Sequence, residues 1–331
     1  MKKVYLISSL LAGILLIGCG GSGGNSNDNS NNSVSNLTPN SASTIFSNAK
    51  LASPTKENAQ KLAESFANLK DTSEGLNPEN LNTIPLNSSE SLIKENTILI
   101  NLFKNINTKN IVLNEVVGEK EECEDGGYVT YNGNRDDNSV NIIVKYDNCK
   151  EDGLTFNGTL NLVGNGCDND CGCSNYTYKN INISIKEDKS GKEINLQGDL
   201  IINDVVYIYN SDKCELESAH YNETLIGNLD NKKFGVKDLE FDVEFNSSYI
   251  SYKYYKGNVY FDNLSKYAQI VSDDSNKPFK IDLTNLQYVD GSQKFKLNKG
   301  SVILQVENNE LEYLLDKDND GNIDETGIIN N

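Results

Sequence analysis

The sequence predicts a mainly β protein with helices near its N-terminus (an α+β arrangement), in which a long antiparallel meander forms the body. Apolar residues recur with helical spacing between about residues 41 and 110, and they alternate with polar residues from residue 111 onward. Turn sequences such as Asp-Lys-Ser-Gly and Val-Asp-Gly-Ser separate the alternating runs. The length of 331 residues permits one large β domain or two ordinary ones.

The N-terminus carries two lysines, an apolar run from Val4 to Ile17, and then Cys19. This order is typical of a secretory signal, and the run is shorter than the roughly 20 apolar residues of a membrane-spanning helix. The sequence Leu16-Ile17-Gly18-Cys19 resembles the lipobox of bacterial lipoproteins. This resemblance implies that residues 1–18 are a signal peptide and that Cys19 carries a covalent diacylglycerol and an N-acyl chain such as palmitate. Gly20, where an Asp would retain such proteins at the inner membrane, favours the outer membrane, with the body facing the periplasm or the cell surface.

The segment of residues 19–40 is rich in Gly, Ser and Asn and has little to bury, so we expect a disordered tether. Residues 41–110 are expected to form helices that pack on the sheet that follows. The first begins near Thr55, and its apolar face consists of Ala59, Leu62, Ala63, Phe66 and Leu69. The second covers Ser89 to Asn105, and its apolar face consists of Leu92, Leu99, Leu102, Phe103 and Ile106.

Residues 111–315 are expected to form the antiparallel β body. The expected strands are 128–131, 140–146, 155–163, 176–186, 193–202, 205–210, 220–226, 234–245, 249–261, 268–272, 279–288, 293–297, 301–306 and 311–315. A Gly precedes several alternating runs, at 158, 198 and 257, which could reflect a degenerate hairpin repeat. Two closures fit the pattern, a β-sandwich or a curved half-barrel-like sheet covered by the N-terminal helices. The second closure resembles the half-barrel lipoprotein carriers, which bind acyl chains inside the curve.

Six cysteines remain after Cys19 is assigned to lipid, and an even number fits disulfides in an oxidising compartment. These cysteines are Cys123, Cys149, Cys167, Cys171, Cys173 and Cys214. We expect Cys123 to pair with Cys149, because both flank the strands of one hairpin. The spacing of the remaining four favours Cys167 with Cys171 and Cys173 with Cys214. A zinc site that includes Cys214 and His220 is the alternative, which the compartment disfavours.

The last residues contain Asp316-Lys317-Asp318-Asn319-Asp320-Gly321-Asn322-Ile323-Asp324-Glu325, which resembles the calcium loops of EF-hand and dockerin proteins. Alternating acidic residues direct oxygens to one centre, and the glycine permits a sharp turn. The resemblance implies calcium ligands at Asp316, Asp318, Asp320, Asn322, Asp324 and Glu325. Gly327 stands at the twelfth loop position, where the family has a bidentate acid, and Glu325 could substitute for it. Residues 316–331 are thus assigned to this loop and a tail, and a solvated acidic turn is the alternative.

The charge and the supply of catalytic side chains restrict the function classes. The formal charge of −18, from 48 acidic and 30 basic residues, repels phosphate backbones, so nucleic acid is not expected as a partner. His220 is the only histidine, and the one Gly-x-Ser-x-Gly match, at residues 20–24, lies in the Gly-rich tether and not at a strand-to-helix turn, so no nucleophile elbow is expected. Five tyrosines between Tyr249 and Tyr260 suit either strand packing or contact with a glycan or peptide.

These observations lead us to expect a membrane-anchored extracytoplasmic lipoprotein with a non-enzymatic binding or structural role and a C-terminal calcium site. Its partners would be the membrane, through the lipid anchor, and a protein, glycan or lipid ligand that the sequence does not specify. The alternative is a carrier or assembly factor that binds acyl chains in a curved sheet. A glycan-acting hydrolase is the third interpretation, since 48 acids offer many carboxylate pairs but no spacing selects one.

Overall fold

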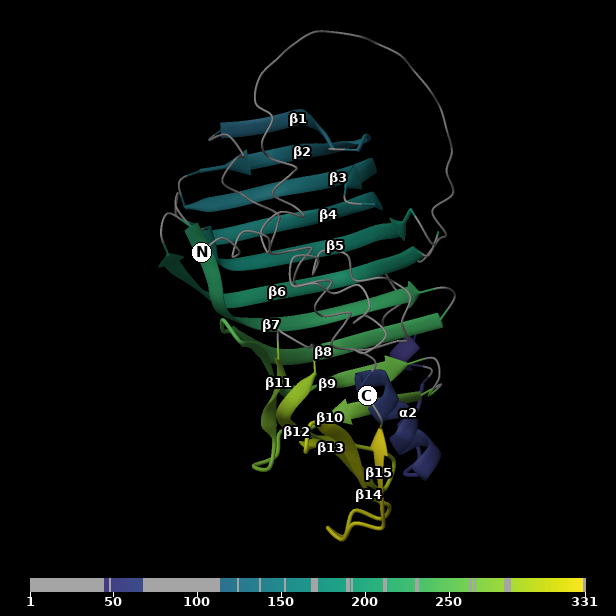
Figure 1. The fold of residues 1–331 in the computed structure, drawn as a ribbon. Coiled ribbons are helices and arrows are strands. Elements are labelled where there is room, and N and C mark those ends of the chain that lie inside the picture. Colours follow the sequence, from purple (N-terminus) through teal and green to yellow (C-terminus); the bar gives the residue numbers. More distant parts are fainter. Residues whose placement is uncertain are drawn as a thin grey trace.

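A computed structural model gives the fold of the chain (Figure 1). The structure describes residues 45–67 and 114–329, apart from positions 48, 124, 137, 152, 168–171, 189–190, 192, 211–212, 230–231, 262–263, 265 and 283–286. Cys19, the signal segment, the tether and the expected helix from Ser89 to Asn105 lie outside the described residues. No described helix is long and apolar enough to cross a membrane.

One antiparallel sheet of 15 strands forms the body, which confirms the mainly β class and the meander. The strands are β1 Asn114–Glu122, β2 Tyr128–Arg135, β3 Ser139–Glu151, β4 Leu154–Cys167, β5 Cys173–Glu187, β6 Glu193–Asn210, β7 Lys213–Leu229, β8 Lys232–Phe245, β9 Tyr249–Phe261, β10 Lys266–Ile270, β11 Lys277–Asp282, β12 Tyr288–Lys296, β13 Ser301–Glu307, β14 Glu310–Asp316 and β15 Glu325–Ile329. Each strand from β1 to β9 pairs with the next one along the chain, as does each strand from β12 to β14, and β10 pairs with β12. We call β3–β9 the long-strand region and β10–β15 the short-strand region.

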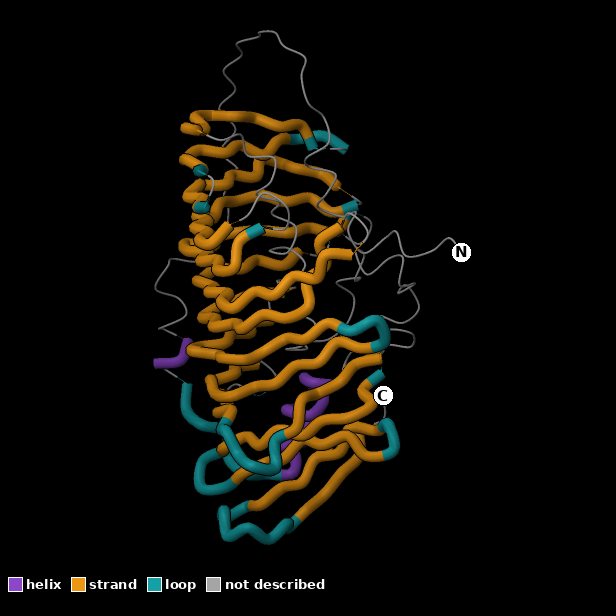
Figure 2. The backbone as a smooth tube through the Cα atoms, turned by 90° about the vertical axis from the view of Figure 1, so that its left-hand side faces the viewer, coloured by secondary structure: helices purple, strands orange, loops and turns teal. Residues whose placement is uncertain are grey.

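The long-strand region is strongly curved. After the quarter turn between Figure 1 and Figure 2 its strands still extend across the view, so each strand bends and the sheet forms a trough. Val140, Ile142, Val144 and Tyr146 of β3 are buried, whereas Asn141, Ile143 and Lys145 between them are exposed. The trough therefore has one buried apolar face and one exposed, mainly polar face, as expected from the alternating pattern.

A recurring β-bulge produces much of this curvature, because a bulge bends its strand and increases the local twist. The bulged residues have φ values of 48°, 52° and 51° and are Asn148, Asn180 and Asp238. Their amides donate, at 2.8, 2.9 and 3.0 Å, to side-chain oxygens of the neighbouring strand, namely those of Asn157, Asp199 and Thr224. The bulged strands are β3, β5 and β8, which Figure 1 shows in this order along the sheet, so the bulge recurs several times.

Glycine is required beside these bulges. Gly198 has a φ of 141°, and a Cβ there would collide with the Thr224 carbonyl of β7. Gly158 and Gly257 also have positive φ and face neighbouring backbone in the same way. The glycines that precede the alternating runs in the sequence are thus sites of close strand approach.

Several strand boundaries differ from the sequence-based expectation. The expected strand 279–288 is divided between β11, which ends at Asp282, and β12, which begins at Tyr288. The runs 193–202 and 205–210 form the single strand β6, because Asp204, with a φ of 52°, lies in a bulge and not in a turn. The edge strand β1 was not expected, since its sequence is rich in Glu and Lys. Charged side chains are common on edge strands, where they oppose pairing with another chain.

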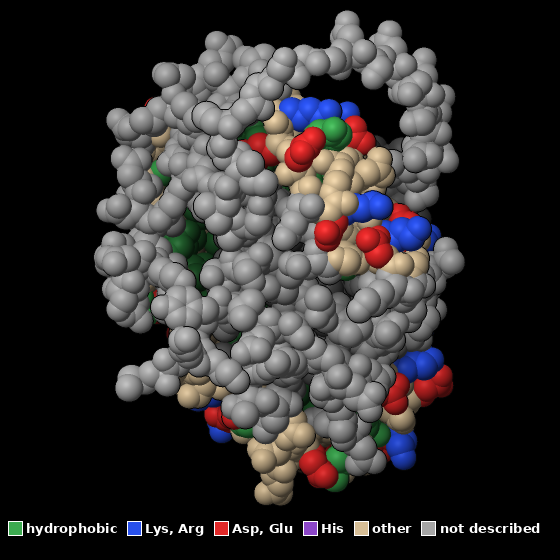
Figure 3. Space-filling view, turned by 45° about the horizontal axis from the view of Figure 1, so that its top comes forward, with side chains coloured by type: hydrophobic (Ala, Val, Ile, Leu, Met, Phe, Trp, Pro, Cys, Tyr) green, Lys and Arg blue, Asp and Glu red, His purple; other side chains and the backbone are tan. Residues whose placement is uncertain are grey.

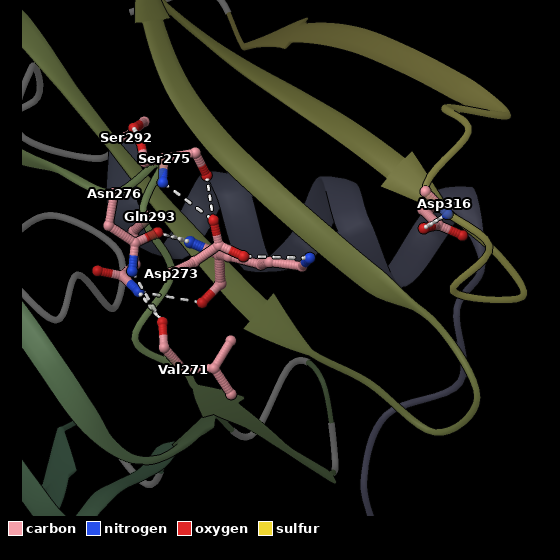
Figure 4. A network of polar contacts seen from close by, with 9 residues as sticks. Val271, Asp273, Ser275, Asn276, Ser292, Gln293 and Asp316 are labelled. Carbon is pink, nitrogen blue, oxygen red and sulfur yellow. Dashed lines mark hydrogen bonds and ion pairs between the residues drawn. The ribbon is translucent and has the colours of Figure 1, made fainter.

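The short-strand region begins with an interrupted strand. The N-terminal half of β9 pairs with β11 and its C-terminal half pairs with β10, and β12 also pairs with both. Strands β10 and β11 therefore share one position in the sheet, and residues 271–276 bulge out between them. Figure 4 shows the polar network that holds this segment. Asn276 Nδ2 donates to the Val271 carbonyl at 2.8 Å, and the Lys294 amide donates to Asn276 Oδ1 at 3.0 Å.

The helix α2, Lys56–Ala67, begins where the sequence predicts, and the Asn58 amide donates to the hydroxyl of Thr55 at 3.2 Å. Ala59, Leu62 and Ala63 are buried as expected. The helix contacts β14 and β15. Leu51, which precedes it, forms a parallel bridge with Tyr267 of β10. The N-terminal segment thus packs on the C-terminal end of the sheet.

Two disulfides are present among the described cysteines. Cys123 bonds to Cys149 as expected, across the hairpin that β2 and β3 form. Cys167 bonds to Cys173, so the expected pairings of Cys167 with Cys171 and of Cys173 with Cys214 are wrong. The reason is the β4–β5 register, in which Cys167 and Cys173 are direct cross-strand partners. Cys171 and the side chain of Cys214 lie outside what the structure describes.

Candidate metal site in the β14–β15 loop

The acidic loop connects β14 to β15, the last hairpin of the sheet. Asp316 ends β14 and is only 4% exposed, and Glu325 begins β15. Residues 316–331, which were assigned to a loop and a tail, thus include the final strand. Pairing of Leu315 with Glu325 fixes the distance between the two ends of the loop.

Backbone amides shape the loop around Asp316. Asp316 Oδ1 accepts from the Asn319 amide at 2.6 Å, and Oδ2 accepts from the Gly321 amide at 3.0 Å. Asn319 and Gly321 have φ values of 61° and 91°, in the left-handed region that Asn and Gly tolerate best. The sequence therefore folds the chain tightly over this carboxylate, which Figure 4 shows at the entry to the loop.

Three carboxylates come together here. Ligand oxygens of Asp316, Asp318 and Asp324 all lie within 4.8 Å of one another. The Lys317 amide donates to Asp324 Oδ2 at 2.7 Å, which fixes that side chain. Close carboxylates repel one another, and a bound cation relieves this repulsion. The cluster could therefore hold a metal ion.

Two of the other predicted ligands, Asp320 and Glu325, lie outside the cluster. Asp320 accepts from the amide of Asn322 at 2.8 Å and from its side chain at 2.9 Å, so these two residues bond to each other. The hydrogen bond from the Asn322 amide is the main reason why the pKa of Asp320 is lowered. Glu325 Oε1 accepts from Lys317 Nζ at 2.6 Å, and this contact raises the pKa of Lys317. Glu325 is thus held by a lysine and is not part of the cluster of three aspartates.

His220 and Cys214 cannot share a metal ion. Both lie in β7, six positions apart, and a strand rises about 3.3 Å per residue, so the two positions are too far apart along the strand to bind one ion. The zinc alternative with these two residues is therefore wrong. Sequence reasoning missed the actual neighbours of His220. Asp242 is its cross-strand partner in β8, a relation that depends on strand register.

Glu223 is a second group that the pattern did not single out. It lies on the apolar face of β7, between Leu200 of β6 and Leu239 of β8, and is 1% exposed. Its Oε1 has no hydrogen-bond partner. Burial raises the pKa of Glu223 to about 8, so the side chain is mostly protonated at neutral pH. Its alternation with Tyr221 and Leu225 was the available signal, since it placed an acid at a core position.

The tyrosines of β9 divide between the two faces of the sheet. Tyr252 and Tyr254 are buried, and Tyr254 contacts Phe241 of β8 at a ring-centroid distance of 5.4 Å. Tyr255 lies on the opposite face. The strand-packing interpretation therefore accounts for the two buried rings. Figure 3 shows acidic and basic side chains interspersed on the described surface in that view.

The comparisons with known proteins identify no relative: no protein-family model, no curated protein and no solved structure matches this chain.

Proposed function

We propose that the protein is a membrane-anchored extracytoplasmic lipoprotein with a non-enzymatic binding or structural role, and that calcium orders the end of its sheet. The lipobox-like sequence before Cys19 supports the anchor. The two disulfides suit an oxidising compartment. The cluster of Asp316, Asp318 and Asp324 is the observation that supports a calcium site.

The anchor is tested by detergent phase partition and by mass spectrometry of the N-terminal peptide after bacterial expression. The wild-type chain should enter the detergent phase and begin with an acylated Cys19. Cys19→Ala should remain in the aqueous phase, because it lacks the cysteine that would carry the acyl chains needed for firm anchoring. Equal partition of both chains would overturn the proposed anchor.

Calcium binding is tested by chemical unfolding of the full chain with and without 10 mM calcium. Extracellular modules bind calcium with a Kd of about 0.1 to 1 mM, so the free energy of unfolding should increase by about 1.4 to 2.7 kcal/mol. Asp318→Asn should abolish the increase. Asp320→Asn is the matched control, because Asp320 lies in the same loop but outside the cluster. An increase that Asp318→Asn retains in full would contradict the site.

Acyl-chain binding is a second candidate, which the curved trough favours. The buried side of β3 to β9 is mostly apolar, with residues such as Ile142, Leu160, Tyr178 and Phe241. A sheet of this shape could enclose lipid tails, which bind to concave apolar surfaces. Native mass spectrometry of the purified protein tests this. A bound lipid that survives buffer exchange supports the carrier, whereas protein without lipid, also after incubation with phospholipid vesicles, excludes it.

A further inference from the structure

The polar face of β7–β9 carries a cluster of five residues that neither the anchor nor the calcium loop uses. We define it as the His220 cluster, and its members are His220 of β7, Glu240 and Asp242 of β8, and Tyr255 and Lys256 of β9. We propose that His220 and Glu240 bind a divalent transition-metal ion of the zinc type. The proposal does not depend on the proposed function.

The histidine is oriented by a carboxylate. His220 Nδ1 lies 2.7 Å from Asp242 Oδ1, and the hydroxyl of Tyr255 donates to Asp242 Oδ2. Burial, followed by this hydrogen bond, raises the pKa of Tyr255 to about 12, so its hydroxyl keeps the proton that it donates. Asp242 is thus an acceptor on both oxygens. When His220 is neutral, Asp242 therefore keeps the imidazole proton on Nδ1, and the lone pair is on Nε2.

This arrangement is the one that metal-binding histidines use. A histidine that coordinates a metal through one nitrogen almost always donates the other N–H to a carboxylate or carbonyl, which fixes the ring and raises its basicity. Asp242 is placed to do this for His220. Tyr255 holds Asp242 in turn.

Glu240 supplies the second ligand. Its Oε1 lies 3.9 Å from His220 Nε2, and its Oε2 is held by Lys256 Nζ at 2.6 Å. With Nε2 unprotonated, two acceptors face each other. Zinc bonds to nitrogen and oxygen are about 2.0 to 2.2 Å long, so tetrahedral ligands lie about 3.4 Å apart. The two atoms therefore need to approach by only about 0.5 Å.

The ligand set and its exposure determine which ions fit. Imidazole with carboxylate suits zinc, copper and nickel, whereas calcium prefers a shell of oxygen ligands. The side chains of His220 and Glu240 are 27% and 24% exposed, so an ion can reach them from solvent. Water would fill the remaining coordination positions. Such a site exchanges its metal, unlike a closed structural zinc site.

The single histidine makes the test direct. The full chain is labelled with ¹⁵N-histidine and titrated with Zn²⁺ at neutral pH, and NMR follows its two ring nitrogens. Before zinc is added, the signals should report the Nδ1–H form. Zinc should then shift the Nε2 signal in a saturable manner.

Variants at the cluster separate ligand from positioning roles. Glu240→Gln should weaken zinc binding, and Asp242→Asn should weaken it about 10- to 100-fold, the usual effect of removing a carboxylate that orients a histidine ligand. Asp242→Asn should also change the ring tautomer, which a merely structural role would not do. Glu244→Gln is the matched control, because Glu244 is an exposed acid of the same strand that lies outside the cluster.

Three results would overturn the proposal. The first is a ring whose nitrogen signals do not respond to zinc, and the second is an unchanged affinity in Glu240→Gln. The third is a response that Asp318→Asn removes, because the zinc would then bind at the acidic loop.

Discussion

The long-strand and short-strand regions belong to one sheet but are stabilised by different means. The long-strand region has 13 to 18 residues per strand, repeated bulges with facing glycines, and both described disulfides at its N-terminal end. The short-strand region has 5 to 9 residues per strand and contains no cysteine. Side-chain networks around residues 271–276 and Asp316 hold its irregular segments. Curvature thus depends on backbone geometry in the first region, and loop order depends on polar side chains in the second.

The largest effect is expected where curvature requires glycine. Gly198→Val should lower the free energy of unfolding by about 2 to 6 kcal/mol, because backbone strain and a steric clash add at this position. Gly153→Val is the matched control, since Gly153 also has a positive φ but no atom lies within 4 Å of the position that its Cβ would occupy. It should cost about 1 to 3 kcal/mol from strain alone. Urea unfolding measures the stability of both variants. Equal losses would show that the close approach of the neighbouring strand is not the reason why position 198 requires glycine.

Glu223, the buried acid of the long-strand region, should make the free energy of unfolding depend on pH. Folding raises the pKa of Glu223 to about 8 from about 4.3 in an unfolded chain. The folded state binds this proton more tightly, so the stabilisation is complete below about pH 4 and is lost as the pH rises to about 8. Glu223→Gln, which does not ionise, should gain about 4 kcal/mol relative to wild type over this range.

Urea unfolding at several pH values measures this difference. The exposed acid Glu244 provides the control, and the curve of Glu244→Gln should run parallel to that of the wild type. Parallel curves for Glu223→Gln would contradict the burial of an ionisable group. The lowered pKa of Asp273, caused first by the amide of Ser275, acts in the opposite direction, and its contribution is lost as the pH falls below about 4.

Removal of the disulfides should affect the long-strand region more than the short-strand region. The bonds join residues 26 and 6 positions apart, so chain entropy predicts losses of about 3.5 kcal/mol without Cys123–Cys149 and about 2 kcal/mol without Cys167–Cys173. Paired Cys→Ser variants and amide hydrogen exchange measure this. Exchange should accelerate in β2–β5 first, and an equal acceleration in β13 and β14 would show that the sheet opens as one unit.

The smallest effect is expected in the network of residues 271–276. Asn276→Ala removes two partly buried hydrogen bonds and should cost about 1 to 2 kcal/mol. Asn246 provides the comparison from the long-strand region, because its side chain bonds only within an exposed turn. Asn246→Ala should change stability by less than about 0.5 kcal/mol. Thermal unfolding ranks the two variants, and the reverse order would contradict the role of the network.

Alternation predicted most of the sheet, because one face of each strand is buried and side chains alternate between faces. It failed at Asn203 and Asp204, where polar residues that suggest a turn occupy a bulge. The glycines at 158, 198 and 257 were visible as a repeat, but their role was not. That role depends on the backbone of the neighbouring strand, which local sequence does not specify.

In the candidate sites too, local spacing predicts some contacts, whereas others depend on strand register or on competition between side chains. Asp316, Asp318 and Asp324 lie within one short loop, so spacing alone could bring them together. The pairing of Asp320 with Asn322 and of Glu325 with Lys317 depends on side-chain competition within that loop. His220 and Asp242 are 22 residues apart and meet only through strand register. Cys167 and Cys173 show that register also decides between nearby cysteines.

The docking of α2 on β14 and β15 has a consequence for the order of folding. Most strands pair with the preceding strand, so the sheet can grow as the chain is synthesised. Leu51 instead pairs with Tyr267, and the helix contacts β14 and β15, the last two strands to be made. Helix α2 must therefore wait for the final hairpin before Ala59 and Leu62 are buried. A ribosome that stalls before residue 310 would hold a sheet without the two strands on which α2 packs.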